Sequence, residues 1–321
     1  MDRITVLNTG RLPPALVQRL QEKHDYLDLA TATATDRAAF LAEHGPRVRA
    51  VVTSAAAGID AATLAALPNV QVISSFGVGL DKLPLDTAAA RGIAVGYTPD
   101  VLNDCVADQG FGLLLDVMRR ITSADRFLRA GNWAAGQLPP LSRRVSGAKL
   151  GIVGFGRIGQ TIARRASGFD MVVRYHARRP VADTGVAHEP SLLALAQWCD
   201  VLMVIVSGGP ATRHLINAEV LDALGPQGFL VNVARGSVVD EQALVLALQQ
   251  GRIAGAGLDV FEAEPQVPHE LLAMDQVVLQ PHVASATQET RAAMAQRVWD
   301  NLDSFLTTGQ LVSAAPLPAP H

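Results

Sequence analysis

Short apolar runs alternate with segments of helical periodicity over nearly the whole length of the chain. The first third contains five runs rich in Val and Ile, at 4–10, 26–30, 48–54, 70–76 and 92–98. Six more follow an irregular stretch, at 148–153, 171–176, 200–206, 228–234, 254–260 and 277–283. Such runs are typical of strands buried on both faces, and their alternation with helices predicts parallel sheets covered by helices.

Helical periodicity separates and follows these runs. It occupies 13–23, 60–67 and 101–120, and it returns at 287–307, beyond the last apolar run. Two series of strands predict an α/β protein of two parallel-sheet domains, Rossmann-like or flavodoxin-like in class, with an interdomain cleft.

The position of the final helix decides how the chain divides. Because this helix follows the second series, it can return to the first domain, which then consists of residues 1–98 and 287–321. Residues 99–286 form the second domain, with the long helix at its start. The tail at 313–321 is rich in Pro and Ala and is expected to be irregular.

Charge and cysteine content narrow the class of protein. The formal net charge is −3, so no basic surface points to nucleic acid or to acidic lipid. Cys105 and Cys199 fit no metal-ligand spacing, which favours a reduced, cytoplasmic protein without a metal site. No apolar run approaches the ~18 residues of a membrane span, and the first residues lack the apolar segment of a secretory signal.

A glycine-rich turn follows the predicted strand at 148–153 and opens a helix. It consists of Gly154, Phe155, Gly156, Arg157, Ile158 and Gly159. In such a turn the first glycine permits the tight bend, the second lets backbone approach a pyrophosphate, and the third lets helix pack on strand. The helix N-terminus adds free N–H groups and a positive partial charge. The turn predicts a dinucleotide site, although a similar glycine pattern also occurs in turns without a ligand.

The residues after the next predicted strand bear on the choice of dinucleotide. An NAD-binding fold usually places an acidic residue there, about 20 residues after the glycine turn, to hold the ribose hydroxyls. This chain has Ala177, Arg178 and Arg179 instead. A carboxylate would repel the 2′-phosphate of NADP(H), whereas guanidinium groups pair with it. The pattern predicts NADPH, with weaker use of NADH; the alternative is two solvated arginines on an exposed loop.

Candidate catalytic side chains lie at the ends of three strands of the second series. They are Arg235, Asp259, Glu264 and His282. Since ligands of open α/β sheets bind at the carboxyl ends of the strands, these side chains are expected to meet. Each also has an ordinary structural alternative, as a salt-bridge arginine, part of an acidic loop or a turn histidine.

An arginine, a carboxylate and a histidine at one sheet edge suit the reduction of a 2-keto acid. Arg235 can hold the substrate carboxylate and polarise the C2 carbonyl, and His282 can donate a proton to the forming alkoxide. A carboxylate such as Glu264, bonded to the histidine, favours the charged imidazole and fixes the ring.

Several segments resemble the signature segments of the D-isomer-specific 2-hydroxyacid dehydrogenases, in that family's order and spacing. They read GIVGFGRIGQ, VNVARGSVVDEQAL, GAGLDVFEAEP and LQPHVASAT, together with SSFGVGLDKLPL, GYTPDVLNDCVAD and RAGNW. The similarity covers nearly the whole chain, and it is greatest to NADPH-dependent glyoxylate/hydroxypyruvate and hydroxyphenylpyruvate reductases.

The resemblance implies roles for individual residues. Arg235 would anchor the substrate, His282 would be the acid/base and Glu264 its partner. Backbone amides of Val78 and Gly79 would bind the substrate carboxylate. Further cofactor contacts would come from Val206, Ser207, Thr212, Val233, Ala234, Asp259 and Ala284, with Asp259 near the nicotinamide carboxamide.

The resemblance also implies an assembly and leaves two alternatives open. Members of the family are typically dimers that close two domains over a small 2-keto or 2-hydroxy acid, so a homodimer is expected. Ala284 stands where many members carry glycine, which slightly narrows the nicotinamide pocket. The alternatives are a 3-phosphoglycerate dehydrogenase-like enzyme, which usually uses NAD, and a non-catalytic dinucleotide-sensing protein like the family's corepressors.

Overall fold

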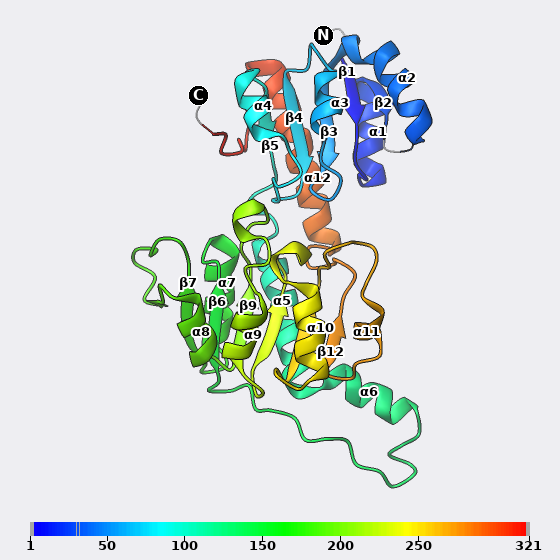
Figure 1. Cartoon of the computed structure of the whole chain (residues 1–321). Helices are drawn as coiled ribbons and strands as arrows, with labels where there is room; N and C mark the ends of the chain where they lie inside the picture. The colour runs from blue at the N-terminus through cyan, green and yellow to red at the C-terminus, as the bar shows by residue number, and fades with distance from the viewer. Residues whose placement is uncertain (1–2, 30, 32, 319–321) are drawn as a thin grey trace. The chain divides into compact units, whose positions relative to one another are not determined.

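A computed structural model describes residues 3–29, 31 and 33–318 of the chain, which divides into two compact units. The first unit contains the residues up to Leu102 together with those from Thr287 onward, and the second runs from Asn103 to Ala286. Each unit is built on a parallel sheet with helices on its faces (Figure 1). The predicted α/β fold with two parallel-sheet domains is therefore confirmed, while the cleft between them stays a prediction.

The first unit contains a five-stranded sheet in the order β2-β1-β3-β4-β5. Its strands are β1 (Thr5–Asn8), β2 (Asp25–Asp28), β3 (Val48–Ser54), β4 (Val72–Phe76) and β5 (Ala94–Gly96). Its helices are α1 (Pro14–Lys23), α2 (Ala34–His44), α3 (Ala61–Ala65), α4 (Leu85–Ala90) and α12 (Gln288–Thr308). The inner strands are buried along almost their full length, as a sheet covered on both faces requires.

Helix α12 belongs to the first unit although it follows the whole second unit in sequence. It packs against β4, β5 and α1. Asn301 on this helix is fully buried, donates to the Tyr97 carbonyl at 3.0 Å and accepts the Ser313 N–H at 2.8 Å. The tail is therefore less irregular than expected, because Ala314 pairs with the edge of β5. Residues 319–321 of the tail lie outside the described residues.

The second unit contains a seven-stranded sheet in the order β12-β11-β10-β9-β6-β7-β8. Its strands are β6 (Lys149–Val153), β7 (Val172–His176), β8 (Ala187–His188), β9 (Val201–Val204), β10 (Phe229–Asn232), β11 (Gly255–Leu258) and β12 (Val277–Leu279). The chain runs from β6 outward to β8, then returns to the other side of β6 and continues to β12. The carboxyl ends of β6 and β9 thus border the crevice where such sheets bind ligands.

The helices of the second unit differ in how their first turns are capped. They are α5 (Asn103–Arg119), α6 (Ile121–Arg129), α7 (Arg157–Ser167), α8 (Leu192–Trp198), α9 (Ala218–Leu224), α10 (Glu241–Gln249) and α11 (His269–Leu272). The side chains of Ser191, Asn217 and Asp240 cap α8, α9 and α10. Helix α7 begins at Gly156 without a side-chain cap, so its first N–H groups are available to a ligand.

Every apolar run interpreted as a strand contains one, although most observed strands are shorter. The expected strand at 26–30 begins one residue earlier, at Asp25, and its residue 30 lies outside the described part of the chain. The sequence reading missed β8, a two-residue edge strand without an apolar run. No helix in the described ranges combines the length and apolar character needed to cross a membrane.

Candidate active site

Three neighbouring strands of the second unit carry the candidate catalytic residues. The sheet places β12, β11 and β10 side by side and parallel. Asp259 directly follows β11, Arg235 lies three residues after β10, and His282 lies three residues after β12. Because parallel neighbours end at the same edge, residues far apart in sequence meet in one place.

His282 and Glu264 form a hydrogen-bonded pair. His282 Nδ1 lies 2.8 Å from Glu264 Oε2, and the other carboxylate oxygen accepts the Phe261 N–H at 3.2 Å. Burial raises the pKa of Glu264, but the hydrogen bond and charge of His282, the Phe261 N–H and the charge of Arg235 together hold it below its ordinary value. Glu264 is thus an ionised acceptor for the imidazole, in the arrangement expected of an acid/base and its partner.

Asp259 holds the loop that carries His282. Its carboxylate accepts the Val283 N–H at 2.8 Å and the Ala284 N–H at 3.0 Å, and its backbone carbonyl accepts the His282 N–H at 2.8 Å. The residue is 1% exposed, so burial raises the pKa of its carboxyl group, and the two loop amides oppose that shift. Asp259 therefore has a structural role that the sequence did not indicate; its contact with nicotinamide stays a prediction.

Asn232 and Gly236 shape the turn around Arg235. Asn232 is 1% exposed, accepts the Ala234 N–H at 3.0 Å and donates to the Arg235 carbonyl at 3.0 Å. A Cβ at Gly236 would lie 1.8 Å from the backbone carbon of Phe261, so only glycine lets the two chain segments approach. The sequence analysis missed both residues. The signal available for Asn232 was a polar residue inside the apolar run at 228–234.

The glycine turn has the three steric roles expected of it. A Cβ at Gly154 (φ 96°) would lie 2.9 Å from the Ile205 backbone, and one at Gly159 would lie 2.4 Å from the Gly154 oxygen. At Gly156 nothing lies within 4 Å, so the backbone is open to a bulky group. Open backbone at an uncapped helix start suits a pyrophosphate, so the residues present fit a dinucleotide.

The other residues of the turn differ in their exposure. Phe155 is 3% exposed and stacks on Tyr175 with ring centroids 3.9 Å apart, so it can offer a cofactor only its backbone. Ile158 is half-buried and Arg157 is exposed.

Arg178 and Arg179 follow β7 and are both exposed. The Gly154 N–H donates to the His176 carbonyl at 2.9 Å, so the turn after β7 adjoins the glycine turn. Ala177 occupies the position where an acid would stand, and its carbonyl lies 2.9 Å from His188 Nε2. The two arginines thus follow a strand whose end adjoins the glycine turn, and their contact with a 2′-phosphate stays a prediction.

The remaining expected cofactor residues lie after β9, β10 and β12. Thr212 donates to the Ser207 carbonyl at 2.7 Å, which closes the loop after β9 that begins near Val206. Val233, Ala234 and Ala284 are all buried. Their contacts with a cofactor stay predictions.

Val78 and Gly79 lie in the first unit, in the loop after β4. Gly77 (φ 143°) starts this loop, and its N–H donates to Thr98 Oγ1 at 3.1 Å. Within the described residues, the backbone N–H groups of Val78 and Gly79 donate no hydrogen bond to the protein. Two such donors side by side are suited to a carboxylate.

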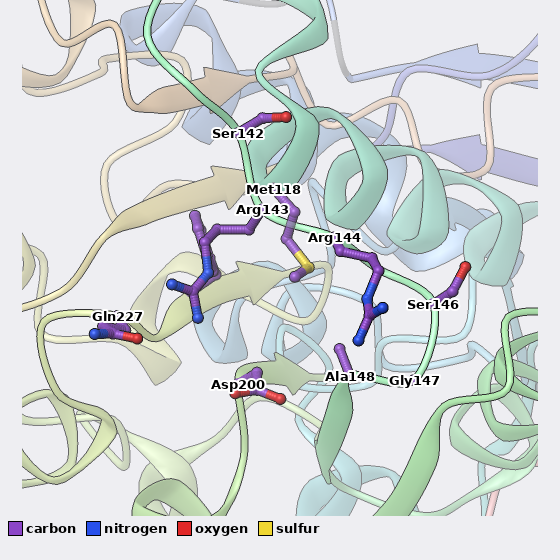
Figure 2. Close-up of a pocket in the computed structure, with 10 residues that line it drawn as sticks. Met118, Ser142, Arg143, Arg144, Ser146, Gly147, Ala148, Asp200 and Gln227 are labelled. Atoms are coloured by element: carbon purple, nitrogen blue, oxygen red, sulfur yellow. The ribbon is translucent and has the colours of Figure 1, made fainter.

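A cavity of about 330 Å³ lies at the opposite edge of the second unit's sheet. Figure 2 shows Arg143 and Arg144 reaching from the loop before β6 toward Asp200, which precedes β9. None of the candidate catalytic residues lines this cavity. It is therefore distinct from the edge that carries His282. The described residues hold no group of three or more His, Cys, Asp or Glu suited to a metal ion.

Comparison with known proteins agrees with the arrangement of these residues. Residues 111–284 match the family model described as D-isomer specific 2-hydroxyacid dehydrogenase, NAD binding domain. A 2-ketogluconate reductase of Gluconobacter oxydans is 44% identical over 311 residues, covering 96% of this chain and 97% of that protein. A glyoxylate/hydroxypyruvate reductase of Arabidopsis thaliana is 42% identical over 313 residues, covering 98% of this chain and 99% of the relative.

A solved structure has the same fold over nearly the full length. It is an NADPH-dependent glyoxylate/hydroxypyruvate reductase from Sinorhizobium meliloti in complex with NADP and malonate. The TM-score is 0.90 at 42% sequence identity, covering 99% of this chain and 98% of that one.

The contact at Gly236 leads to a stability prediction. Gly236→Ala forces a methyl group against the Phe261 backbone, and we expect it to lower the free energy of unfolding by about 3 kcal/mol or more. Thermal unfolding followed by circular dichroism measures the change. Gly112→Ala is the control, because nothing lies within 4 Å of that helical position and alanine favours the helix. An unchanged melting temperature for Gly236→Ala would contradict the steric argument.

Proposed function

Because the chain belongs to the family of D-isomer specific 2-hydroxyacid dehydrogenases, we propose that it reduces small 2-keto acids to D-2-hydroxy acids with NADPH. The observation that carries this proposal is the hydrogen-bonded pair of His282 and Glu264 beside the charge of Arg235. These are the groups that reduction of a carbonyl next to a carboxylate requires.

The three side chains have different tasks in the proposed reaction. When bound, the nicotinamide cofactor supplies a hydride to C2 of the keto acid. Arg235 holds the substrate carboxylate and polarises the C2 carbonyl. His282 gives its proton to the oxygen that becomes the hydroxyl, and Glu264 stabilises the charged imidazole and fixes its orientation through Nδ1.

The proposed preference for NADPH rests on the residues after β7. No carboxylate stands at position 177, and Arg178 and Arg179 are exposed beside the glycine turn. Guanidinium groups in this place attract the 2′-phosphate, whereas an acid would repel it. NADH lacks that phosphate, so its use is proposed to be weaker.

We assign substrate binding to the first unit and cofactor binding to the second. The N–H groups of Val78 and Gly79 are proposed to hold the substrate carboxylate. Ala55 lies beside this loop, since its N–H donates to the Phe76 carbonyl at 3.0 Å. The three alanines at 55–57 leave room for the group attached to C2 of the substrate, which is a hydrogen in glyoxylate and a hydroxymethyl group in hydroxypyruvate. A sugar keto acid is the second candidate, favoured by the 44% identity to the Gluconobacter enzyme.

The proposed assembly is a homodimer formed through the segment after α5. Helix α6 buries none of its residues, and Figure 1 shows the loop after it extending away from the sheet of the second unit. Five large apolar side chains of this segment are exposed by more than half, namely Ile121, Leu128, Trp133, Leu138 and Leu141. Such a run of exposed apolar surface marks an association site. A cytoplasmic location is proposed because neither Cys105 nor Cys199 forms a disulfide.

The acid/base assignment predicts two different kinetic effects. His282→Ala removes the proton donor, and we expect kcat/KM for glyoxylate with NADPH to fall about 10²–10⁴-fold. Glu264→Gln keeps the hydrogen-bond acceptor but removes the charge that favours protonated imidazole. We expect it to move the alkaline limb of the pH–rate profile to lower pH. His269→Ala, at an exposed histidine of the same unit, is the control. Near-normal turnover by His282→Ala would refute the proton-donor role.

The cofactor assignment predicts a reversal of preference. In Arg178→Ala/Arg179→Asp the 2′-phosphate loses two cations and meets a carboxylate. We expect KM for NADPH to rise roughly 10–100-fold while NADH becomes the better cofactor. Initial rates with each cofactor are measured on glyoxylate, hydroxypyruvate, phenylpyruvate and 2-ketogluconate. Arg49→Ala removes an exposed arginine of the first unit and should leave both KM values unchanged. Equal use of both cofactors by the unaltered enzyme would contradict the assignment.

The proposed dimer predicts a change in molar mass. The chain of 33.9 kDa should elute with about twice that mass in size-exclusion chromatography with light scattering. Leu141 is 98% exposed, and Leu141→Glu should shift the equilibrium toward the monomer, because a carboxylate would be buried in the interface. Leu272→Glu alters an exposed leucine on α11 and should leave the mass unchanged. A monomeric unaltered protein would exclude the proposed assembly.

A further inference from the structure

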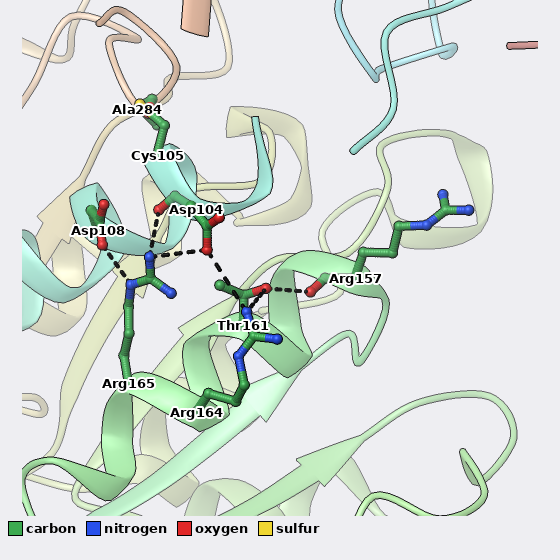
Figure 3. Close-up of polar contacts among 8 residues, drawn as sticks. All are labelled: Asp104, Cys105, Asp108, Arg157, Thr161, Arg164, Arg165 and Ala284. Carbon is green, nitrogen blue, oxygen red and sulfur yellow. Dashed lines mark hydrogen bonds and ion pairs between the residues drawn. The ribbon is translucent and has the colours of Figure 1, made fainter. Parts of the chain in front are cut away.

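One guanidinium group joins the end of α7 to the start of α5 (Figure 3). Arg165 lies in the last turn of α7, and Asp104 and Asp108 lie in the first two turns of α5. Arg165 Nη2 donates to Asp104 Oδ1 at 3.1 Å and to the Asp104 carbonyl at 3.3 Å, while Nε donates to Asp108 Oδ1. The hydrogen bond to Asp108 raises the pKa of the guanidinium. Three acceptors from one helix thus share one cation.

The position of this bridge suits both helices. A cation in the last turn of a helix and a carboxylate in the first turn each complement the helix dipole. Arg165 is 25% exposed, whereas Asp104 and Asp108 are 75% and 66% exposed, so each contact alone contributes little stability. The planar fork nevertheless orders two carboxylates and a carbonyl at once, because its donors lie on separate nitrogens held in one plane. The bridge therefore specifies geometry more than it stabilises the fold.

Helix α5 in turn contacts the loop that carries His282. Cys105, next to Asp104, donates from Sγ to the Ala284 carbonyl at 3.0 Å. The N–H of Ala284 donates on its other side to Asp259. The backbone of Ala284, two residues after His282, is therefore held through its carbonyl by the first turn of α5 and through its N–H by Asp259 at the end of β11.

We propose that Arg165 is a positioning residue for the proton donor. Arg165 fixes the first turn of α5 to the end of α7. Cys105 in that turn therefore holds the Ala284 carbonyl at a set distance from the glycine turn, which lies at the other end of α7. The distance between the proton donor and the cofactor then depends on a side chain that touches neither. The inference rests on the proposed acid/base role of His282.

Arg165→Gln and Arg164→Gln are the matched variants that test the bridge. Arg164 is adjacent and 73% exposed, and its Nη2 lies 3.7 Å from Asp104 Oδ1, beyond hydrogen-bond distance. Arg164→Gln therefore removes the same charge but leaves the three hydrogen bonds of Arg165 in place. We expect Arg165→Gln to speed amide hydrogen exchange at Val283 and Ala284 about tenfold. It should also lower kcat for glyoxylate with NADPH roughly tenfold, because small displacements of catalytic groups are costly. KM for NADPH should change little, and Arg164→Gln should behave like the unaltered enzyme in both measurements.

A pair of variants at Cys105 tests the route of the effect. Cys105→Ser keeps a hydrogen-bond donor and should preserve exchange and kcat, whereas Cys105→Ala should reproduce Arg165→Gln. In the double variant Arg165→Gln/Cys105→Ala the effects on exchange and on kcat should not add, because both substitutions break the same series of contacts. Unchanged exchange at Val283 and Ala284 in Arg165→Gln, or unchanged kcat, would overturn the inference. Near-normal turnover by His282→Ala would instead refute the proton-donor role in the proposed function. The exchange measurement does not depend on activity, so the two failures can be told apart.

Discussion

The buried carboxylate of Asp259 is the constraint on which the second unit's site depends. A charge that is 1% exposed is tolerated only when hydrogen-bonded, and its donors are the backbone N–H groups of Val283 and Ala284. The loop cannot move away without leaving that carboxylate unsatisfied. This explains why His282 can keep a left-handed backbone at φ 54°, which costs about 1–3 kcal/mol in a residue other than glycine. The same contacts join the ends of β11 and β12.

Around this centre, backbone groups do most of the positioning and side chains supply the charge. The glycine turn offers uncovered backbone at the start of α7, and Gly236 lets the turn after Arg235 pass against the Phe261 backbone. The side chains to which the proposed reaction assigns a task are few, namely Arg235, Glu264 and His282 at one edge and two arginines after β7. Rigid backbone with few charges suits a reaction in which one proton must arrive at one oxygen.

Local pattern was sufficient to predict much of the fold. Apolar runs predicted every strand except β8, because strands buried on both faces carry apolar residues throughout, whereas a two-residue edge strand carries no such signal. The dinucleotide turn and the absence of an acid at position 177 could also be predicted from the sequence, since each depends on residues close together in the chain. The predicted ends of the strands were approximate, because a strand stops where the neighbouring strand no longer offers hydrogen-bond partners. The pairing of Ala314 with Gly96 of β5 was missed because it joins residues far apart in sequence.

The amino-acid sequence alone determined the class of fold, the dinucleotide turn and the identity of the charged groups, because these follow from spacing along the chain. The tertiary structure decided which groups meet. The order β12-β11-β10 brings His282 beside Glu264, and the packing of α5 on α7 brings Arg165 to Asp104 and Asp108. Asp104 and Arg165 are 61 positions apart, and Cys105 and Ala284 are 179 apart. Contacts of that range depend on how sheets and helices pack in three dimensions, which no local pattern records.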